Sequence, residues 1–371
     1  MGVALTVGII GVGKISEQYL ANLPTFPQLR LVAVADLDLD RARAVAAEHG
    51  VRALSVDELL ADPEVDCVLN LTIPAAHVEI GTRALEAGKH VFAEKPLGLD
   101  AVEAAPLLDL AERLGLRVAS APDTVLGTGI QTARRALDSG LIGTPIAAQV
   151  HWSAPGHERW HPAPAFYYQP GGGPLLDMGP YYLSSLVHFF GAVTRVSGVA
   201  TRSDRARSVE SGPLAGTPLP VAVDTHISAL LEHASGATTT LTVSFEVWRT
   251  RSPLFEVYGT TGTLAVPDPN HFSDPVEVSL RDEPEWTALE DSAGVIGTGR
   301  GVGLADLADA LRHGRPERAS GRLALHVLEV MDAILRSSAE GVVVPIASPV
   351  ERPEPVPLQT PAGDLLEGVR S

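Results

Sequence analysis

The rarest basic residue in this chain marks the first place where we expect chemistry. Only three of its 28 basic residues are lysines, and Lys95 lies directly after the apolar run Val91–Ala93, between Glu94 and Pro96. A lysine ammonium can titrate when water is excluded from it, which an arginine guanidinium cannot do. Ligands of parallel α/β proteins bind beyond the carboxyl ends of the strands, so Lys95 is a candidate catalytic residue. The alternative is a solvated Glu-Lys pair in a turn.

An aspartate and a tyrosine farther along the chain could share acid–base work with this lysine. Asp177 and Tyr181 are four residues apart, which places them on one face of a helix. Oxidation of an alcohol needs one group that takes the hydroxyl proton and another that stabilises the developing alkoxide. A tyrosine is a weak base at neutral pH because its ordinary pKa is about 10, but a neighbouring ammonium favours the phenolate. We expect Lys95 to polarise the reacting oxygen, Tyr181 to exchange the proton and Asp177 to position them; the alternative for Tyr181 is a core aromatic residue.

A glycine-rich loop near the start of the chain could bind a diphosphate. The segment Gly11–Ser16 follows the first apolar run, and glycines there let backbone N–H groups approach a pyrophosphate. Asp36 ends the next apolar run, where a carboxylate accepts hydrogen bonds from ribose hydroxyls and repels a 2′-phosphate. Leu37 follows it, which favours NAD over NADP, whereas Arg41 and Arg43 are close enough to leave NADP possible.

The elements that must position these residues divide the chain into two predicted domains and a tail. Residues 1–122 alternate apolar runs with helical patterns, which predicts an α/β, doubly wound parallel sheet. Residues 123–345 combine strand-like runs and short glycine turns with helical patterns, which predicts an α+β domain with a largely antiparallel open sheet. Its helices are expected at 127–139, 175–190, 304–313 and 321–339. The polar segment 204–220 is expected to be a loop or disordered, and the proline-rich residues 346–371 an extended tail.

Taken together, these motifs resemble the Gfo/Idh/MocA oxidoreductases, the family of glucose–fructose oxidoreductase and inositol dehydrogenase. Gly11–Ser16, Asp36 and Glu94-Lys95-Pro96 carry the resemblance, and Leu71–His77 and Gly171–Tyr181 extend it over nearly the whole chain. It implies a Rossmann domain, a second domain whose open sheet commonly mediates oligomers, and a Lys-Pro bond that is often cis. The commoner family pattern is Asp-x-Gly-x-His, whereas this chain has tyrosine at the last position, as in the glucose–fructose oxidoreductase branch.

The resemblance also implies a set of cofactor contacts. We expect the cofactor to contact Gly11, Gly13, Lys14, Ile15, Asp36, Thr72, Pro74, His77, Glu94 and Lys95.

Histidines and aromatic residues gather between residues 151 and 168, just before a triple glycine. Aromatic faces with a few polar groups suit a sugar ring, so Trp160, His161 and Tyr167 are expected to line the substrate site beside the three catalytic candidates. His157 and His161 could instead bind a metal ion with Asp177. Histidines four residues apart need a helix to converge, and the prolines and glycine around them oppose one, so we expect no metal.

Composition limits the partners of the chain. Its 28 basic and 45 acidic residues give a net charge of −17, which disfavours nucleic acid and anionic membranes. No apolar window is long enough to span a bilayer, and the first residues lack the basic start of a signal peptide. The single cysteine, Cys67, fits a reducing compartment. We therefore expect a cytoplasmic protein that acts on a small molecule and forms a homodimer or homotetramer through its second sheet.

The predicted function is NAD(P)-dependent hydride transfer to or from a secondary alcohol or ketone of a sugar, sugar derivative or cyclitol. One alternative is an enzyme that cleaves glycosidic bonds through a transient redox cycle on a tightly held NAD. Another is an NAD-binding sensor without catalysis, which the presence of Lys95, Asp177 and Tyr181 disfavours because binding alone does not need them.

Overall fold

The computed structural model describes residues 4–366, and its first sheet is entirely parallel. The strand order is β3-β2-β1-β4-β5-β6. The chain therefore adds strands on one side of β1 up to β3, and then on the other side from β4 to β6. The strands are β1 (Leu5–Ile10), β2 (Leu29–Ala35), β3 (Arg52–Leu54), β4 (Cys67–Asn70), β5 (His90–Ala93) and β6 (Val118–Ser120). The helices between them are α1 (Ser16–Asn22), α2 (Leu39–His49), α3 (Val56–Ala61), α4 (His77–Glu86) and α5 (Ala101–Leu114). This confirms the predicted doubly wound sheet, whose crevice at the β1–β4 divergence is where such folds bind ligands.

Local sequence explains these elements. Strands β4 and β5 are almost fully buried and mostly apolar because helices cover both faces of a parallel sheet. Helix α2 begins where the side chain of Asp38 accepts hydrogen bonds from the N–H groups of Asp40 and Arg41, and it ends at Gly50 with φ of 66°. Helix α3 begins with a reciprocal cap between Ser55 and Glu58.

The second sheet is mixed and mostly antiparallel. Its order is β14-β13-β12-β11-β7-β10-β9-β8-β15, and only the β7–β10 pair is parallel. The strands are β7 (Pro145–Ser153), β8 (Val193–Thr201), β9 (His226–His233), β10 (Thr238–Ser244), β11 (Phe255–Gly259), β12 (Gly262–Ala265), β13 (Glu277–Leu280), β14 (Glu283–Ala288) and β15 (Val344–Pro345). Sequence analysis missed β14 because all six of its residues are exposed and it lacks the apolar alternation that marks a half-buried strand.

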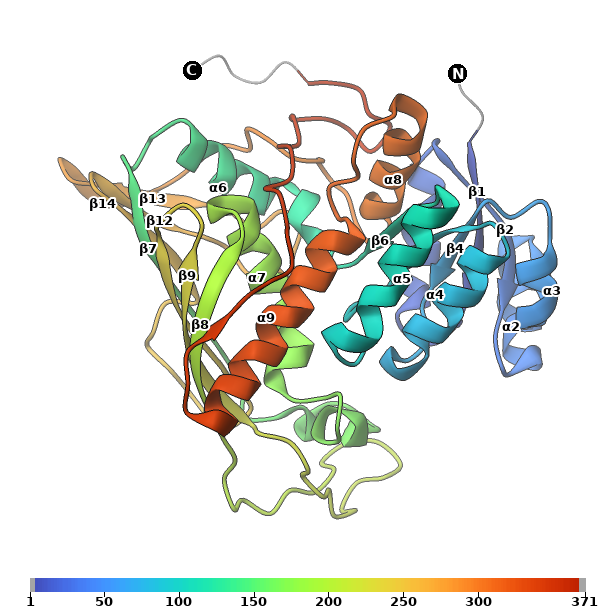
Figure 1. The fold of residues 1–371 in the computed structure, drawn as a ribbon, viewed down its shortest axis with the longest axis horizontal. Helices are drawn as coiled ribbons and strands as arrows, with labels where there is room; N and C mark the ends of the chain where they lie inside the picture. Colours follow the sequence, from blue (N-terminus) through green and yellow to red (C-terminus); the bar gives the residue numbers. More distant parts are fainter. Residues whose placement is uncertain (1–3, 367–371) are drawn as a thin grey trace.

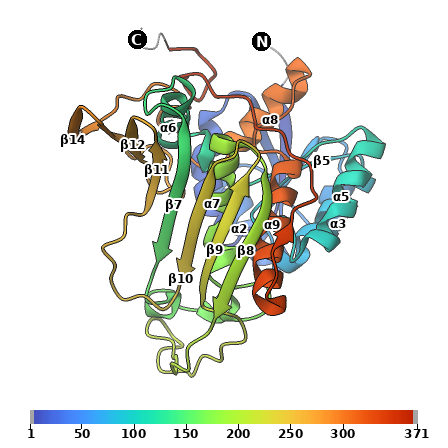
Figure 2. The ribbon, with the colours of Figure 1, turned by 60° about the vertical axis from the view of Figure 1, so that its left-hand side comes forward.

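The helices of the second half are α6 (Thr128–Asp138), α7 (Pro174–Phe190), α8 (Val302–His313) and α9 (Gly321–Glu340), each within two residues of its predicted bounds. Helices α7 and α9 pack on one face of the second sheet, whereas α8 packs on β6 and β2 of the parallel sheet. Helix α9 packs on β8, on α7 and on α5 of the first sheet, so it lies between the two halves (Figure 1). The face formed by β7, β10, β9 and β8 is free of helices on its other side (Figure 2). We propose a boundary between the two domains near residue 122.

The proline-rich C-terminal residues are extended, as predicted, but they are bound to the body of the protein rather than free. Strand β15 pairs with β8, and Val356 is buried. Arg352 donates to the carbonyl of His188 and forms an ion pair with Asp138. Prolines remove backbone donors but leave carbonyls, which side chains can bond; Arg134 donates to the carbonyl of Pro353 in this way. Residues 367–371 of the predicted tail lie outside the described residues.

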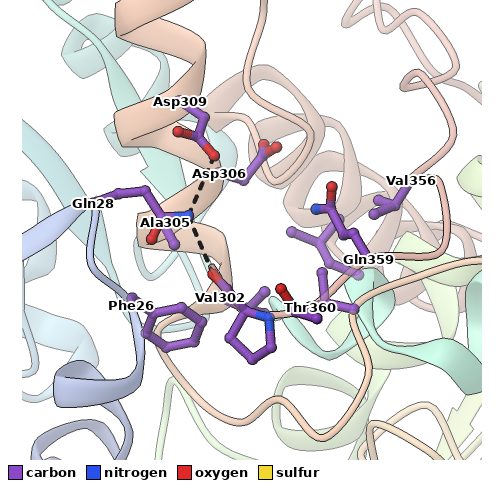
Figure 3. Close-up of a pocket in the computed structure, with 12 residues that line it drawn as sticks. Phe26, Gln28, Val302, Ala305, Asp306, Asp309, Val356, Gln359 and Thr360 are labelled. Carbon is purple, nitrogen blue, oxygen red and sulfur yellow. Dashed lines mark hydrogen bonds between the residues drawn. The ribbon is translucent and has the colours of Figure 1, made fainter. Parts of the chain in front are cut away.

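The end of this segment closes a small cavity against the parallel sheet. The Gln28 amide donates to Asp309 of α8 and to the carbonyl of Pro361, at 3.4 and 3.2 Å (Figure 3). The cavity between Phe26, α8 and Val356 measures about 20 Å³, which leaves room for a water molecule but not for a sugar.

Within residues 4–366, no helix has both the length and the apolar character required to cross a membrane.

Candidate active site

The phosphate loop has the geometry that a diphosphate requires. Gly11 has φ of +95°, and a Cβ there would lie 2.8 Å from the backbone carbonyl of Leu71. A Cβ on Gly13 would meet no atom within 4 Å, so the backbone of Gly13 borders open space that a ligand can enter. The loop residues thus fit a dinucleotide. Lys14 projects into solvent and forms an ion pair with Glu17, and Ile15 is partly buried just before α1.

Asp36 lies at the end of β2 and is tied to this loop. Its carboxylate accepts hydrogen bonds from the N–H of Val12 at 2.8 Å and the N–H of Asp38 at 2.9 Å. Arg41 lies 3.7 Å from Asp36, so it remains near the expected position of a 2′-phosphate. The other arginine considered, Arg43, forms an ion pair with Asp40 on its own helix.

His77 braces the backbone around the predicted cofactor loop. Its Nδ1 lies 2.7 Å from the carbonyl of Pro96, and its Nε2 lies 3.0 Å from the carbonyl of Thr72. Burial lowers the pKa of His77 more than these carbonyls raise it. A neutral imidazole has one N–H, so the ring donates to one of these two carbonyls. It lies between the segment before α4 and the turn after β5, with Pro74 half-buried beside it. A direct contact between His77 and the cofactor stays a prediction.

Lys95 and Asp177 form a buried ion pair across the two halves of the protein. The Lys95–Pro96 bond is cis, as the resemblance implied. The Nζ atom of Lys95 donates to the Asp177 carboxylate at 3.0 Å and to the Asp177 carbonyl at 2.7 Å. Burial alone would lower the pKa of Lys95, but the negative charge of Asp177 outweighs it and holds that pKa above its usual value. Burial would raise the pKa of Asp177, but Lys95 and a hydrogen bond from His157 bring it to about 2.

Tyr181 lies one helical turn beyond Asp177 and touches two cations. The centre of its ring is 5.1 Å from Nζ of Lys95, and its hydroxyl accepts a hydrogen bond from Nη2 of Arg300 at 3.0 Å. The tyrosine is buried, yet it borders the lysine rather than only apolar residues. Sequence analysis missed Arg300, because it lies in a glycine-rich loop 119 residues from Tyr181 and no motif marks it.

His157 completes the surroundings of Asp177 as a hydrogen-bond donor. Its Nε2 lies 2.9 Å from the Asp177 carboxylate, and its Nδ1 accepts from the indole N–H of Trp160 at 3.2 Å. Because an indole N–H only donates, Nδ1 carries no proton, and Nε2–H must donate to Asp177. Both ring nitrogens are thereby engaged. Over the described residues, no three histidine, cysteine or acidic side chains are grouped so that they could hold a metal ion.

The predicted substrate loop forms an aromatic wall on this side. It contains two short 3₁₀ turns, His157–Arg159 and Pro164–Tyr168, instead of an α-helix. The ring of Tyr167 stacks edge-on to His157 at 4.5 Å, and burial together with the charge of Asp177 raises the pKa of Tyr167, which keeps it a phenol. His161 contacts Tyr167 at 5.6 Å, and Trp160 is more than half exposed at the rim. Tyr167 therefore contacts the histidine that bonds Asp177.

Glu94 holds the backbone of Lys95 in position. This buried carboxylate accepts hydrogen bonds from the hydroxyl of Tyr19 at 2.8 Å and from the N–H of Lys95 at 3.0 Å. It thereby fixes the backbone of the catalytic candidate at the carboxyl end of β5.

Two family models match this chain. Residues 5–121 match the oxidoreductase family with an NAD-binding Rossmann fold, and residues 130–265 match the GFO/IDH/MocA C-terminal domain. The dTDP-3,4-didehydro-2,6-dideoxy-alpha-D-glucose 3-reductase of Streptomyces violaceoruber is 35% identical over 241 residues, which cover 62% of this chain and 68% of the reductase. The trans-1,2-dihydrobenzene-1,2-diol dehydrogenase of Danio rerio is 31% identical over 297 residues, 72% of this chain and 82% of that enzyme.

A solved structure shares the fold at lower identity. Levoglucosan dehydrogenase in complex with NADH and L-sorbose has a TM-score of 0.80 at 22% identity, over 94% of this chain and 100% of that one. From its two matched family domains and these relatives, the chain belongs to the Gfo/Idh/MocA family of NAD-binding oxidoreductases.

Proposed function

We propose that this oxidoreductase interconverts a secondary alcohol and a ketone on the ring of a sugar, sugar derivative or cyclitol, with Lys95, Asp177 and Tyr181 as its catalytic residues. The observation that carries the proposal is the Lys95 ammonium, held by Asp177 within 5.1 Å of the Tyr181 ring at the carboxyl end of β5. Binding of a dinucleotide alone would not require a buried cation, a carboxylate and a phenol at that edge.

We assign two parts of the dinucleotide, the diphosphate and a ribose, to residues of this chain. The backbone of Gly11–Ser16 borders the open space for the diphosphate, and Asp36 lies where ribose hydroxyls would bind. We assign the ribose to Asp36 and prefer NAD, because its carboxylate would repel a 2′-phosphate. Bound NAD supplies the nicotinamide that accepts or returns a hydride.

The chain's own residues handle the substrate oxygen and its proton. A lysine ammonium has three N–H bonds, and Asp177 accepts two of those of Lys95, so one remains for the substrate oxygen. In the oxidation direction, that oxygen gives its proton to the Tyr181 phenolate while Lys95 stabilises the developing negative charge. In the reduction direction, Tyr181 returns the proton. Asp177 keeps Lys95 charged and is itself held by His157.

Substrate class and assembly follow from two surfaces. Tyr167, His161 and Trp160 present aromatic faces and polar edges, a combination that suits a ring with hydroxyl groups at its rim. The two relatives named above act on a deoxyhexose nucleotide and a cyclic diol.

For assembly, we propose a homodimer or homotetramer formed through the uncovered sheet face, where Val199 and Leu230 are exposed.

Calorimetric titration with NADH and NADPH, after a check for cofactor already bound, tests this function first. We expect NADH to bind more tightly than NADPH, followed by turnover of cyclic polyols or their ketones. Failure of both cofactors to bind would overturn the proposal. Release of a cleaved sugar without net formation of NADH would replace it with the redox-cycle alternative.

A further inference from the structure

Arg300 lies buried beneath Tyr181, in the loop that precedes α8. Its side chain is only 7% exposed, and Nη2 donates to the hydroxyl oxygen of Tyr181 at 3.0 Å and to the side-chain carbonyl of Asn270 at 3.2 Å. The guanidinium carbon lies 5.5 Å from the centre of the Tyr181 ring. Burying a guanidinium is costly unless its charge is paired and hydrogen-bonded, and the Tyr181 hydroxyl is one of the groups that this arginine bonds.

The loop that carries Arg300 is locked in place from the parallel sheet. Asp123, fully buried just after β6, accepts hydrogen bonds from the N–H groups of Gly301 at 2.8 Å and Gly303 at 3.1 Å. Gly301 has φ of +106°, which favours glycine, and a Cβ on Gly303 would lie 2.7 Å from that of Asp123. The carboxylate of Asp123 also lies 3.5 Å from Nη1 of Arg300. The position of Arg300 is therefore fixed by backbone bonds as well as by charge.

The chemistry of a guanidinium determines how the Tyr181 hydroxyl can be used. An arginine only donates, so the oxygen of Tyr181 must accept at that contact and its own proton must point elsewhere. No hydrogen bond from this hydroxyl to another group occurs among residues 4–366, which leaves the proton free for a substrate oxygen. When Tyr181 is a phenolate, this charge-assisted hydrogen bond also becomes an ion pair and strengthens.

The remaining charges around Tyr181 make this second cation necessary. Lys95 lies over its ring, but Asp177, Glu94 and Asp123 place three carboxylates nearby, and Tyr19 and Tyr167 are phenols whose pKa values burial raises. His157 is neutral, as the indole of Trp160 dictates. Without Arg300, a phenolate at Tyr181 would add a fourth negative charge to these three carboxylates, and Lys95 would be their single positive partner in this group.

We propose that Arg300 is the positioning residue of the catalytic tyrosine: it orients the hydroxyl of Tyr181 toward the substrate and stabilises its phenolate. This inference rests on the proposed function of Tyr181. It gives a physical reason why tyrosine can stand where the commoner family pattern has histidine, since an imidazole needs no cation to serve as a base at neutral pH.

The pH dependence of Arg300→Gln, Arg300→Lys and Tyr181→Phe tests the proposal. For alcohol oxidation by the holoenzyme, we expect the acid limb of kcat/KM to move to higher pH by about one unit or more in Arg300→Gln, and by less in Arg300→Lys. Arg300→Gln should lose about 10²-fold in kcat. The double variant Arg300→Gln/Tyr181→Phe should be no slower than Tyr181→Phe, because the arginine acts through the phenol.

A measurement without cofactor or substrate separates this role from a structural one. Tyrosinate absorbance of the apo protein is followed against pH, and the Tyr181 signal is the difference between the wild type and Tyr181→Phe. We expect that signal to appear at higher pH in Arg300→Gln. Arg134→Gln, which removes a different buried arginine, should leave it unmoved.

Unchanged absorbance and an unchanged acid limb in Arg300→Gln, or additive losses in the double variant, would overturn the proposal. If Tyr181→Phe retains full turnover, the proton role of Tyr181 in the proposed function fails instead. The absorbance titration still decides whether Arg300 stabilises the phenolate in that case.

Discussion

Two buried clusters of charged residues meet at the 3₁₀ turn that carries His157, and they differ in how many of their hydrogen-bond donors are paired. His157 and Glu158 are adjacent in sequence, yet His157 donates to Asp177 in the site while Glu158 bonds Arg207 from the polar loop 204–220. Arg207 makes hydrogen bonds through both terminal nitrogens, to Glu158, Glu246 and nearby oxygens. We call Glu158, Arg207 and Glu246 the anchor cluster, and Lys95, Asp177, Tyr181 and Arg300 the site cluster.

The polar segment 204–220 was predicted to be either a loop or disordered, and the anchor cluster holds it as an ordered loop. The loop contains no helix or strand in the structure, but Arg207 is almost fully buried and holds it to the 3₁₀ turn that carries His157. In the site cluster, by contrast, Lys95 keeps one N–H that no group of the described chain accepts. Saturated charges stabilise a structure, whereas charges with free donors remain available to a ligand.

The largest effect that would test this difference is expected in Lys95→Met. The variant should fold and bind NADH within a few-fold of the wild type, but kcat should fall by about 10³–10⁴-fold because the cation that stabilises the alkoxide is gone. Steady-state kinetics and calorimetry measure the two properties. Lys89→Met is the matched control, since Lys89 lies at the opposite end of β5 and its ammonium donates to the carbonyl of Asp62. Retained turnover in Lys95→Met would refute the assigned mechanism.

Arg207→Met should show the opposite pattern, a loss of stability. Removing Arg207 leaves Glu158 and Glu246 with only the partly exposed Arg205 as a counter-charge, so the free energy of unfolding should fall by about 3 kcal/mol in urea denaturation. Arg159→Gln, which breaks an exposed ion pair with Glu210 near the same turn, should cost at most about 1 kcal/mol. Equal losses in the two variants would mean that the cluster does not anchor the loop.

Acid should weaken the site cluster through Asp177. A carboxyl group whose folded pKa is depressed contributes stability that is complete above its unfolded pKa, near 4, and is lost as the pH falls toward its folded pKa of about 2. The stability advantage of the wild type over Asp177→Asn should therefore shrink by about 2 kcal/mol between pH 5 and pH 2. Urea denaturation at each pH measures it. A constant difference over this range would show that Asp177 is not stabilised as an anion.

The smallest predicted effect concerns Asp36, a carboxylate that is bonded to backbone like an anchor but borders the open cofactor surface. Asp36→Ser should lower the preference for NAD over NADP by about tenfold or more, because the charge that repels a 2′-phosphate is removed while Arg41 stays nearby. The ratio of the two dissociation constants is the measurement. Asp40→Ser, at an exposed position in α2, should leave the ratio unchanged. An unaltered ratio in Asp36→Ser would mean that the ribose binds elsewhere.

Local patterns were sufficient to predict most of the fold. The alternation of apolar runs and helical segments in residues 1–122 predicted the parallel sheet, because strands buried on both faces must be apolar throughout. The bounds of α6 to α9 followed from helical periodicity. Strand β14 was missed because it is exposed throughout and its burial follows no period. Periodicity also gave no sign that residues 346–366 are held by arginines from α6 and from the segment before α9.

The sequence by itself determined the candidate residues that share a motif: the phosphate loop, Asp36, Lys95, and Asp177 with Tyr181 one helical turn apart. Each of these relations spans few residues and is therefore governed by the geometry of a single turn, strand or helix. Only the tertiary structure decided that Asp177 meets Lys95 across 82 residues, that His157 donates to it, and that Arg300 ends on Tyr181. Such contacts depend on how distant segments pack together, and a single buried arginine in a glycine-rich loop has no periodicity that could reveal its partner.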